Sequence, residues 1–269
     1  MGKYNQQNAI LPIIQYTNSE IRTWREVYLS YQKIIENHAC DQVKEAFYLI
    51  NKQIKFNSKN IPQLFEVSDK IHQLNSWRIR PVPGLISDKD YLEGLANKVY
   101  CSTQIIRREQ DLTFSPYPDY IHDLLGHIIP IANNEISQKL NLLGRLSISA
   151  TPEQVEQIAF IYWKVFEMGF IKTQSNQYKA LGGAVLSSQQ ELMNVSNKNV
   201  KISHIREFKI IKKYVEDEDL QNEYYYIDTL DDIDEIVENL KQKWHQNKTA
   251  YNPQSPIRNP RIQAFEEDK

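Results

Sequence analysis

The chain has 269 residues, of which 25% are charged, and 32 Lys and Arg against 34 Asp and Glu give a formal net charge of −2. This balance excludes a nucleic-acid partner held by bulk positive charge, and it offers no special attraction to an acidic membrane. No apolar run approaches the ~20 residues of a membrane-spanning helix and the first residues lack a secretory signal, so we expect a cytoplasmic protein. The two cysteines, Cys40 and Cys101, form no CxxC motif, which excludes a disulfide scaffold.

The N-terminal part of the chain has the pattern of amphipathic helices. Residues 1–15 are polar apart from one short apolar stretch, and we expect them to form an arm on the surface. Thr17 and Glu20 make a capping box, in which two side chains bond the free amides at a helix start. Apolar residues then recur at helical spacing after Thr17, after Asp41 and after Pro62, which predicts three helices.

Two proline-containing stretches interrupt the helical pattern that follows. Residues 80–87 are predicted to form a loop, with Asp88 as the N-cap of the next helix. Residues 115–119 are predicted to form a second loop, with Pro118 near the first position of the helix that it feeds. Residues 151–154 (Thr-Pro-Glu-Gln) combine an N-cap, a proline in the first turn and a capping-box residue, and they predict the start of another helix.

The C-terminal part is less regular. Residues 216–219 predict an acidic turn in water, and the tyrosine-rich residues 224–227 predict a short strand. A last helix carries Ile233 and the apolar residues after it, and the polar tail at 249–269 is expected to add little core. The sequence shows no internal repeat and no interior linker.

Two histidines, His122 and His127, flank Gly126 in an otherwise apolar stretch. On an ideal α-helix, residues five apart are separated by about 140°, so these two do not share a face. If the helix ended at Gly126, His127 could turn back and both rings could bind one metal ion. The alternative is a pair of ordinary histidines without a ligand.

Glu167 lies in an apolar helical segment, on the same side as Trp163 and Phe170. Burying an unpaired carboxylate is costly, so this side chain either points to water or has a partner such as a metal ion or an arginine. Two histidines and one carboxylate, with no thiolate, are the facial triad of mononuclear non-haem Fe(II), which leaves coordination positions open. Zinc also accepts this ligand set.

Several spaced segments, taken in order, carry more information than any one of them. They are residues 80–88, 103–107, 115–130, 161–169 and 181–191. Together they resemble the tetrahydropterin-dependent aromatic amino acid hydroxylases, over roughly residues 16–245. The resemblance implies a mainly α fold with a few short β-strands, in a single catalytic domain at residues 16–248. It also implies a monooxygenase that uses dioxygen, a tetrahydropterin and non-haem Fe(II) to hydroxylate an aromatic amino acid.

The resemblance implies a role for each residue that matches the family pattern. The Fe(II) ligands would be His122, His127 and Glu167. The residues around the amino-acid substrate would be Arg107, Ser115, Asp119, Trp163, Ser187 and Ser188. The pterin site would comprise Gly84, Leu85, Ile86, Asp88, Tyr91, Asp123, Ala159 and Tyr162.

Two of these roles have a plain chemical basis. Arg107 would pair with the substrate carboxylate, which a guanidinium fork suits better than a lysine does, and Asp119 would orient it. Tyr91 matches a phenylalanine that stacks on the pterin ring, so an aromatic platform is retained. Without the resemblance, Arg107 would be a surface arginine and Asp119 a charge at a helix N-terminus.

Three positions depart from the family pattern. Asp123 replaces a glutamate and has a shorter reach toward the pterin, Cys101 stands where the eukaryotic members have histidine, and Met168 replaces a phenylalanine. Trp163 favours phenylalanine as the substrate, with tyrosine next, because a large indole leaves less room for another one. Met168 leaves tryptophan open, and residues 216–221, where the family tunes its specificity, do not align.

The start and end of the sequence suggest neither a regulatory domain nor a heptad-patterned tetramerisation helix, so we expect a monomer or homodimer with small-molecule partners only. A non-catalytic relative that kept the fold is an alternative from another class, suggested by Asp123 and Met168. A zinc hydrolase with the same three ligands is a third, although only Asp123 would serve as its general base.

Overall fold

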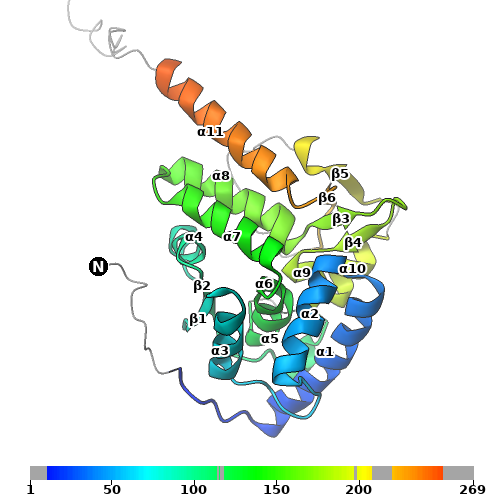
Figure 1. The fold of residues 1–269 in the computed structure, drawn as a ribbon. Helices are drawn as coiled ribbons and strands as arrows, with labels where there is room; N and C mark the ends of the chain where they lie inside the picture. The colour runs from blue at the N-terminus through cyan, green and yellow to red at the C-terminus, as the bar shows by residue number, and fades with distance from the viewer. Residues whose placement is uncertain (1–10, 114, 116–117, 197–198, 208–219, 251–269) are drawn as a thin grey trace, which may run out of the picture.

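The computed structural model describes residues 11–113, 115, 118–196, 199–207 and 220–250. The acidic turn predicted at 216–219, residues 1–10 of the expected arm and the tail beyond residue 250 lie outside the described residues. Within the described part, helices predominate and the strands are short, which confirms the predicted fold class (Figure 1).

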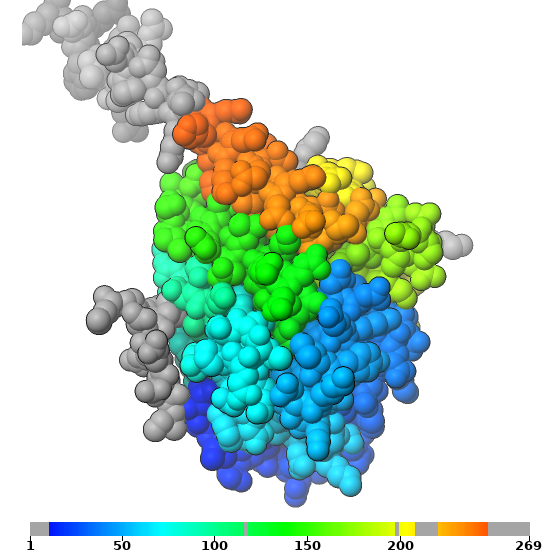
Figure 2. Space-filling view, viewed as in Figure 1, coloured from blue at the N-terminus to red at the C-terminus, as the bar shows by residue number. Residues whose placement is uncertain are grey.

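The three helices predicted near the N-terminus are present. They are α1 (Asn18–Asn37), α2 (Asp41–Ile54) and α3 (Leu64–Asn75). Thr17 caps α1 and forms the expected capping box with Glu20. The three helices lie together on one side of the molecule, in blue and cyan in Figure 2, and bury large side chains such as Trp24 and Tyr31.

The stretch predicted as a loop at 80–87 begins as a strand. β1 (Arg78–Pro81) pairs in parallel with β2 (Val99–Ser102). Pro81 is tolerated at the strand end because a proline, which has no N–H, fits where a two-stranded sheet leaves one edge unpaired. The prediction of a loop was therefore wrong for Arg80 and Pro81 and holds from Val82 onward.

α4 (Asp88–Ala96) begins one residue earlier than predicted. Its N-cap is Ser87, whose hydroxyl accepts a hydrogen bond from the amide of Asp90. Asp88 is the first helical residue instead, where its negative charge still faces the positive end of the helix dipole.

The other helices and helical turns follow in chain order. They are η1 (Glu109–Asp111), α5 (Tyr120–His122), η2 (Asp123–Ile128), α6 (Ile129–Ile131), α7 (Asn134–Ser147), α8 (Pro152–Tyr162), η3 (Trp163–Glu167), α9 (Gly183–Ser187), α10 (Gln189–Asn194), η4 (Ile205–Glu207) and α11 (Asp232–Ala250). Thr151 caps α8 in the predicted capping box, whereas Pro118 lies before Asp119, the N-cap of α5. α11 runs to Ala250, past the boundary expected at 248.

A four-stranded sheet lies beside the helices, with strand order β4-β3-β6-β5. Its strands are β3 (Phe170–Lys172), β4 (Tyr178–Ala180), β5 (Lys201–His204) and β6 (Glu223–Ile227). β4 is antiparallel to β3, and the other pairs are parallel. The strand predicted at 224–227 is thus confirmed as β6.

α7, which the sequence pattern did not predict, holds α4 in place. A Cβ atom at Gly144 would lie 2.2 Å from the backbone nitrogen of Ala96, so only glycine allows this close approach. Asn141 adds hydrogen bonds to the carbonyl groups of Leu95 and Ala96. α7 thereby fixes the helix that carries Tyr91.

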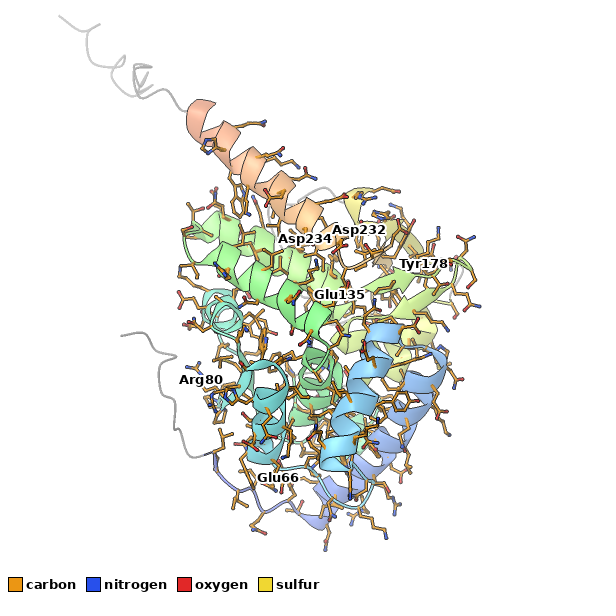
Figure 3. The ribbon with its side chains drawn as sticks, in the orientation of Figure 1. Glu66, Arg80, Glu135, Tyr178, Asp232 and Asp234 are labelled. Carbon is orange, nitrogen blue, oxygen red and sulfur yellow. The ribbon has the colours of Figure 1, made fainter. Side chains whose placement is uncertain are left out.

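α11, which is orange in Figure 2, lies against α7. Lys139 on α7 forms ion pairs with Asp231 and Asp234, and Arg206 pairs with Asp232 at 2.5 Å. Figure 3 labels Asp232 and Asp234 at the start of α11. None of the helices in the described part of the chain has both the length and the apolar character needed to span a membrane.

Candidate metal centre and active-site cavity

His122 and His127 share a face because the helix between them is π-helical. In η2, the amide of Ile129 bonds the carbonyl of Leu124, five residues earlier. This i to i+5 pattern brings residues five apart into line. The two Nε2 atoms lie 3.1 Å apart. The helix continues through Gly126, so the two rings do not need the helix end that the sequence analysis considered, because widening of the helix has the same effect.

Glu167 reaches the same point from a second π-helical segment. η3 ends with a bond from the amide of Met168 to the carbonyl of Trp163. The Glu167 carboxylate lies 3.1 Å from Nε2 of His127 and 3.6 Å from Nε2 of His122. One ligand atom from each residue lies within 4.8 Å of the others, so the three side chains fit a single metal ion. Their donor set suits Fe(II) or zinc.

Ser187 fixes the orientation of the His122 ring. Its hydroxyl donates to the carbonyl of Gly183 at 2.8 Å and lies 2.8 Å from Nδ1 of His122. Since the hydroxyl hydrogen is used on Gly183, the oxygen accepts from Nδ1–H of His122. The lone pair of His122 is then left on Nε2, which faces the ligand cluster, as a metal site requires.

Two glycines allow η2 and α9 to touch at this point. A Cβ atom on Gly126 would lie 2.7 Å from the carbonyl oxygen of Gly183, and one on Gly183 would lie 2.4 Å from the His127 ring. Any larger residue would push the two elements apart. The role of Gly126 is therefore to admit the neighbouring backbone, and it does not end the helix.

The protonation of the cluster also suits a cation. Burial lowers the pKa of His122 to about 4, which keeps its ring neutral. Burial by itself lowers the pKa of His127 and raises that of Glu167. The attraction between the two side chains is stronger than this effect of burial, so the pKa of His127 is raised and that of Glu167 is lowered. His127 and Glu167 thus favour a positive charge between them, which a metal cation supplies.

Arg107 is buried, with an exposed fraction of 6%, so the interpretation as a surface arginine was wrong. Its Nη2 and Nε bond the two carboxylate oxygens of Asp119 at 2.8 and 3.1 Å. Asp119 also caps α5 through the amide of His122, so it links the arginine to a ligand residue. Nη1 of Arg107 is buried and has no hydrogen-bond partner among the described residues.

A cavity of about 830 Å³ opens beside the ligand cluster, and His122 and Glu167 form part of its wall. All eight residues predicted for the pterin line it: Gly84, Leu85, Ile86, Asp88, Tyr91, Asp123, Ala159 and Tyr162. Trp163 lines it as well. Residues from separate parts of the chain that the resemblance assigns to the pterin thus lie around one cavity, and their role stays a prediction.

The remaining predicted residues lie outside that wall. Arg107, Asp119 and Ser187 contact each other or the ligands as described, and Ser115 is half-buried in the loop before α5. Ser188 caps α10 and donates to the carbonyl of Thr113 at 3.1 Å. Met168 is buried in the core and is not among the residues that line this cavity.

Asp123 is held against β2. Its carboxylate accepts hydrogen bonds from the Tyr100 hydroxyl at 3.2 Å and from the Ser102 hydroxyl and the Thr103 amide at 2.9 Å each. Burial raises the pKa of this carboxyl to about 7. Because three hydrogen-bond donors hold the Asp123 carboxylate against β2, it is poorly placed to act as the general base of a hydrolase.

Sequence reasoning missed several cavity residues. Among them are Tyr100, Thr103, Glu156 and Phe160. Glu156, Ala159, Phe160 and Trp163 follow one another at spacings of three, one and three, so the helical period alone could have placed them on one face. No such signal exists for Tyr100 and Thr103, because β2 is too short to show a period.

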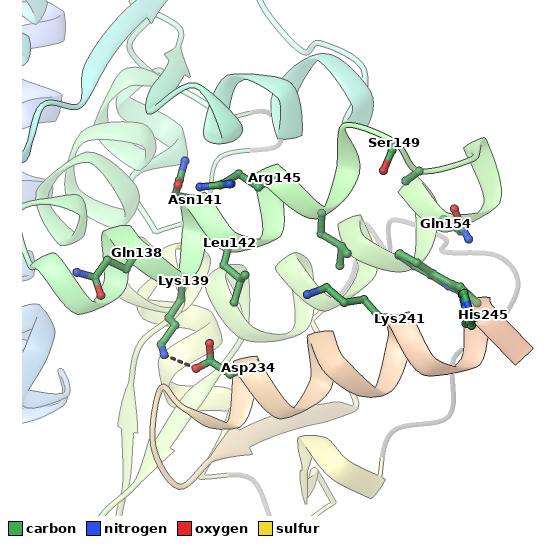
Figure 4. A pocket seen from close by; sticks show the side chains of 13 residues that line it. Gln138, Lys139, Asn141, Leu142, Arg145, Ser149, Gln154, Asp234, Lys241 and His245 are labelled. Atoms are coloured by element: carbon green, nitrogen blue, oxygen red, sulfur yellow. Dashed lines mark hydrogen bonds and ion pairs between the residues drawn. The ribbon is translucent and has the colours of Figure 1, made fainter.

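A second hollow of about 690 Å³ lies between α7 and α11 (Figure 4). Its wall includes Lys139, which is bound to Asp234, and the polar side chains of Gln138, Arg145 and Lys241. None of the residues predicted to bind the metal, the amino acid or the pterin lines this hollow, so the chemistry is assigned to the cavity beside the histidines.

Comparison with curated proteins gives relatives that include phenylalanine hydroxylases and tyrosine monooxygenases. The chain is 35% identical to phenylalanine-4-hydroxylase of Bos taurus over 231 residues, which cover 86% of this chain and 51% of that protein. It is 32% identical to tyrosine 3-monooxygenase of Mus musculus over 238 residues, 88% of this chain and 48% of that protein. The chain thus spans about half the length of these relatives.

Solved structures confirm the fold. The apo phenylalanine hydroxylase of Colwellia psychrerythraea 34H aligns with a TM-score of 0.75 at 24% identity, covering 88% of this chain and 91% of that one. A phenylalanine hydroxylase of Chromobacterium violaceum with bound iron(III) and 7,8-dihydrobiopterin gives a TM-score of 0.74 at 23% identity, with coverages of 88% and 85%.

The family comparison agrees with the geometry. The family described as biopterin-dependent aromatic amino acid hydroxylase matches residues 2–259, which is nearly the whole chain. The matched range contains both π-helical segments, the Arg107–Asp119 pair and the cavity. The chain therefore belongs to the biopterin-dependent aromatic amino acid hydroxylase family.

Proposed function

We propose that the chain is a monooxygenase that hydroxylates the ring of L-phenylalanine to give tyrosine, with dioxygen and a tetrahydropterin as co-substrates. Fe(II) would be held by His122, His127 and Glu167. One observation carries this proposal: the three candidate ligands lie beside a cavity, and every residue predicted to bind the pterin lines that same cavity. When bound, the metal and the pterin supply the activation of dioxygen.

Arg107 binds the substrate carboxylate in this proposal. Its free Nη1 is a buried donor that needs an acceptor, and a substrate carboxylate satisfies it. Asp119 holds the guanidinium in one orientation through two hydrogen bonds and is itself fixed as the cap of α5. The carboxylate end of the substrate is thereby placed relative to His122.

The cavity walls position the two organic molecules. We infer that the backbone of residues 84–86 bonds the polar edge of the pterin and that the Tyr91 ring packs on its face. Asp123 is turned toward β2, so its contact with the pterin is less direct than that of the glutamate usual in the family. The apolar walls limit access of water to the reacting groups.

The preference for phenylalanine rests on Trp163, which lines the cavity and reduces the room for a second indole. Tyrosine hydroxylation, tryptophan hydroxylation or a broad specificity are the alternatives, and the curated relatives include both tyrosine and phenylalanine hydroxylases. Residues 216–219 lie outside the described residues and do not enter this choice. A non-catalytic metal-binding relative is the alternative from a different class.

Both cysteines are buried free thiols, which fits the reducing cytoplasmic location that we propose. A monomer or homodimer with small-molecule partners alone stays a prediction. The domain boundaries at residues 16 and 248 also stay predictions.

The test is an aerobic assay of the Fe(II)-loaded protein with tetrahydropterin and phenylalanine, tyrosine or tryptophan in turn. Products are resolved by chromatography. Tyrosine formed from phenylalanine in step with pterin oxidation supports the proposal, and a faster reaction with another amino acid corrects the substrate. Bound iron with neither pterin oxidation nor product would favour the non-catalytic alternative.

A companion variant tests the ligand assignment. Glu167→Ala should lose bound iron on dialysis and lose turnover while its far-ultraviolet circular dichroism stays that of the wild type, because one of three ligands is removed without any change to the apolar core. Full activity of this variant would refute the assignment.

A further inference from the structure

A chain of hydroxyl groups connects Tyr91 to the ligand residue His127. The Tyr162 hydroxyl lies 3.2 Å from Nδ1 of His127, and the hydroxyls of Tyr91 and Tyr162 are in contact with each other. On the opposite side of the same ring, Nε2 of His127 faces His122 and Glu167. Each nitrogen of His127 thus has its own neighbours, the ligand cluster on one side and Tyr162 on the other.

The direction of these hydrogen bonds follows from the metal site. A histidine that binds a metal through Nε2 carries its hydrogen on Nδ1, so His127 donates to the Tyr162 oxygen. The hydroxyl hydrogen of Tyr162 is then available to Tyr91 or to the Glu167 carboxylate, since Tyr162 contacts both. When Tyr91 receives it, the hydrogen of Tyr91 is available to Tyr100 or to a molecule in the cavity that Tyr91 lines.

The aromatic rings that carry these hydroxyl groups are fixed by their neighbours. Tyr91 meets Tyr162 edge to face, with ring centroids 5.1 Å apart, and meets Tyr100 in the same way at 5.8 Å. Tyr162 is 7% exposed, and its ring lies nearly parallel to that of His127. Rings packed in this way hold their hydroxyls in one geometry, which a hydrogen-bonded chain requires.

Stacking on a pterin needs only the aromatic ring of Tyr91 and does not need its hydroxyl group. The matching position in the resemblance is a phenylalanine, which would stack on a pterin equally well but could not contact Tyr162. The structure therefore gives Tyr91 a polar contact in addition to its place in the cavity wall.

We propose that Tyr91 is a positioning residue for the metal ligand His127, acting through Tyr162, and that it couples the binding of a pterin in the cavity to the metal centre. The proposal rests on the proposed function, because it needs a metal at the ligand cluster. Its experiment uses metal binding and spectroscopy, so that it does not depend on turnover.

The probe is Co(II), which binds imidazole and carboxylate ligands more tightly than Fe(II) and has a visible spectrum that reports its ligand geometry. Two quantities are measured in the full chain: the dissociation constant of cobalt, and the change in the cobalt spectrum when a 7,8-dihydropterin is added. The proteins are the wild type, Tyr91→Phe and Tyr162→Phe. Tyr28→Phe is the matched control, because the Tyr28 hydroxyl is also buried but bonds the carbonyl of Phe56, outside the cavity.

We expect Tyr162→Phe to weaken cobalt binding ~10–100-fold, the usual cost of losing a hydrogen-bond partner of a ligand histidine. Tyr91→Phe should weaken it ~2–10-fold, which is the size of one net hydrogen bond, and should reduce the spectral response to the pterin. Tyr28→Phe should bind cobalt as the wild type does and keep the spectral response.

Tyr91→Phe with wild-type cobalt affinity and a wild-type spectral response would overturn the proposal. Tyr162→Phe removes the hydroxyl that lies between Tyr91 and His127. Wild-type behaviour of this variant would therefore overturn the proposal as well, even if Tyr91→Phe failed to fold. A wild-type protein that holds no cobalt would refute the metal centre of the proposed function, and this proposal with it. The two kinds of failure are therefore distinguishable.

Discussion

The hydroxyl of Tyr31 donates a 2.7 Å hydrogen bond to the carbonyl of Leu125, although the two residues are 94 positions apart. In the π-helical pattern, this carbonyl would bond the amide five residues later, but that residue is Pro130, which has no N–H. Tyr31 supplies the missing donor. A tyrosine of α1 thereby supports the π-helical turn that aligns His122 with His127.

The first prediction tests this support. Tyr31→Phe leaves the Leu125 carbonyl buried without a partner, so we expect a loss of ~1–3 kcal/mol in the free energy of unfolding and weaker cobalt binding. Tyr28→Phe is the matched control, since its hydroxyl bonds the carbonyl of Phe56, away from the ligands. Urea unfolding and cobalt titration measure the two effects. Equal cobalt affinity in both variants would show that Tyr31 only stabilises the core.

The second prediction concerns the substrate carboxylate. Arg107→Lys loses the fork geometry and the free Nη1, so the Michaelis constant for the amino acid should rise ~10–100-fold while that for the pterin changes little. Arg108→Lys is the control, because this neighbouring side chain is 70% exposed and pairs with Asp111. Steady-state kinetics with each substrate varied in turn provide the measurement. A similar rise for both substrates would contradict the carboxylate role.

The third prediction uses the close approach of α9 to η2. Gly183→Ala would place a methyl group 2.4 Å from the His127 ring, which must move or tilt away from the cluster. We expect a loss of stability of ~1–3 kcal/mol and faster loss of bound metal to a chelator. Gly84→Ala adds the same methyl group where nothing lies within 4 Å, and should keep both properties. Metal retention by Gly183→Ala equal to that of Gly84→Ala would contradict the tight packing.

The sequence could predict most of the long helices, although not α7, because capping boxes and helical period are local, and the resemblance supplied the candidate site residues. It could not predict how His122 and His127 come to face each other, since the π-helical turn depends on Pro130 together with Tyr31, a residue from another helix. The burial of Arg107 depends in the same way on Asp119. The strands β2 to β5 have three or four residues each, too few to show a period.

The last prediction concerns the pH dependence of stability, at a buried carboxyl away from the metal centre. Glu191 is 2% exposed and accepts a hydrogen bond from the Tyr224 hydroxyl. Burial raises its pKa above the ordinary value of a glutamate. The folded protein therefore keeps the Glu191 proton at a pH where the unfolded chain has released it. The stabilisation is fully present below the unfolded pKa and is lost as the pH rises through the folded pKa.

Glu191→Gln removes this titration and keeps an acceptor for Tyr224. We expect the stability of the wild type relative to Glu191→Gln to fall as the pH rises from about 4 toward neutrality, measured by urea unfolding at several pH values. Glu238→Gln is the matched control, because Glu238 is 62% exposed and its pairing with Lys241 on α11 is screened by solvent. A difference between the wild type and Glu191→Gln that does not change with pH would mean that the folded and unfolded chains bind this proton equally, and that burial of Glu191 is fully compensated by its hydrogen bonds.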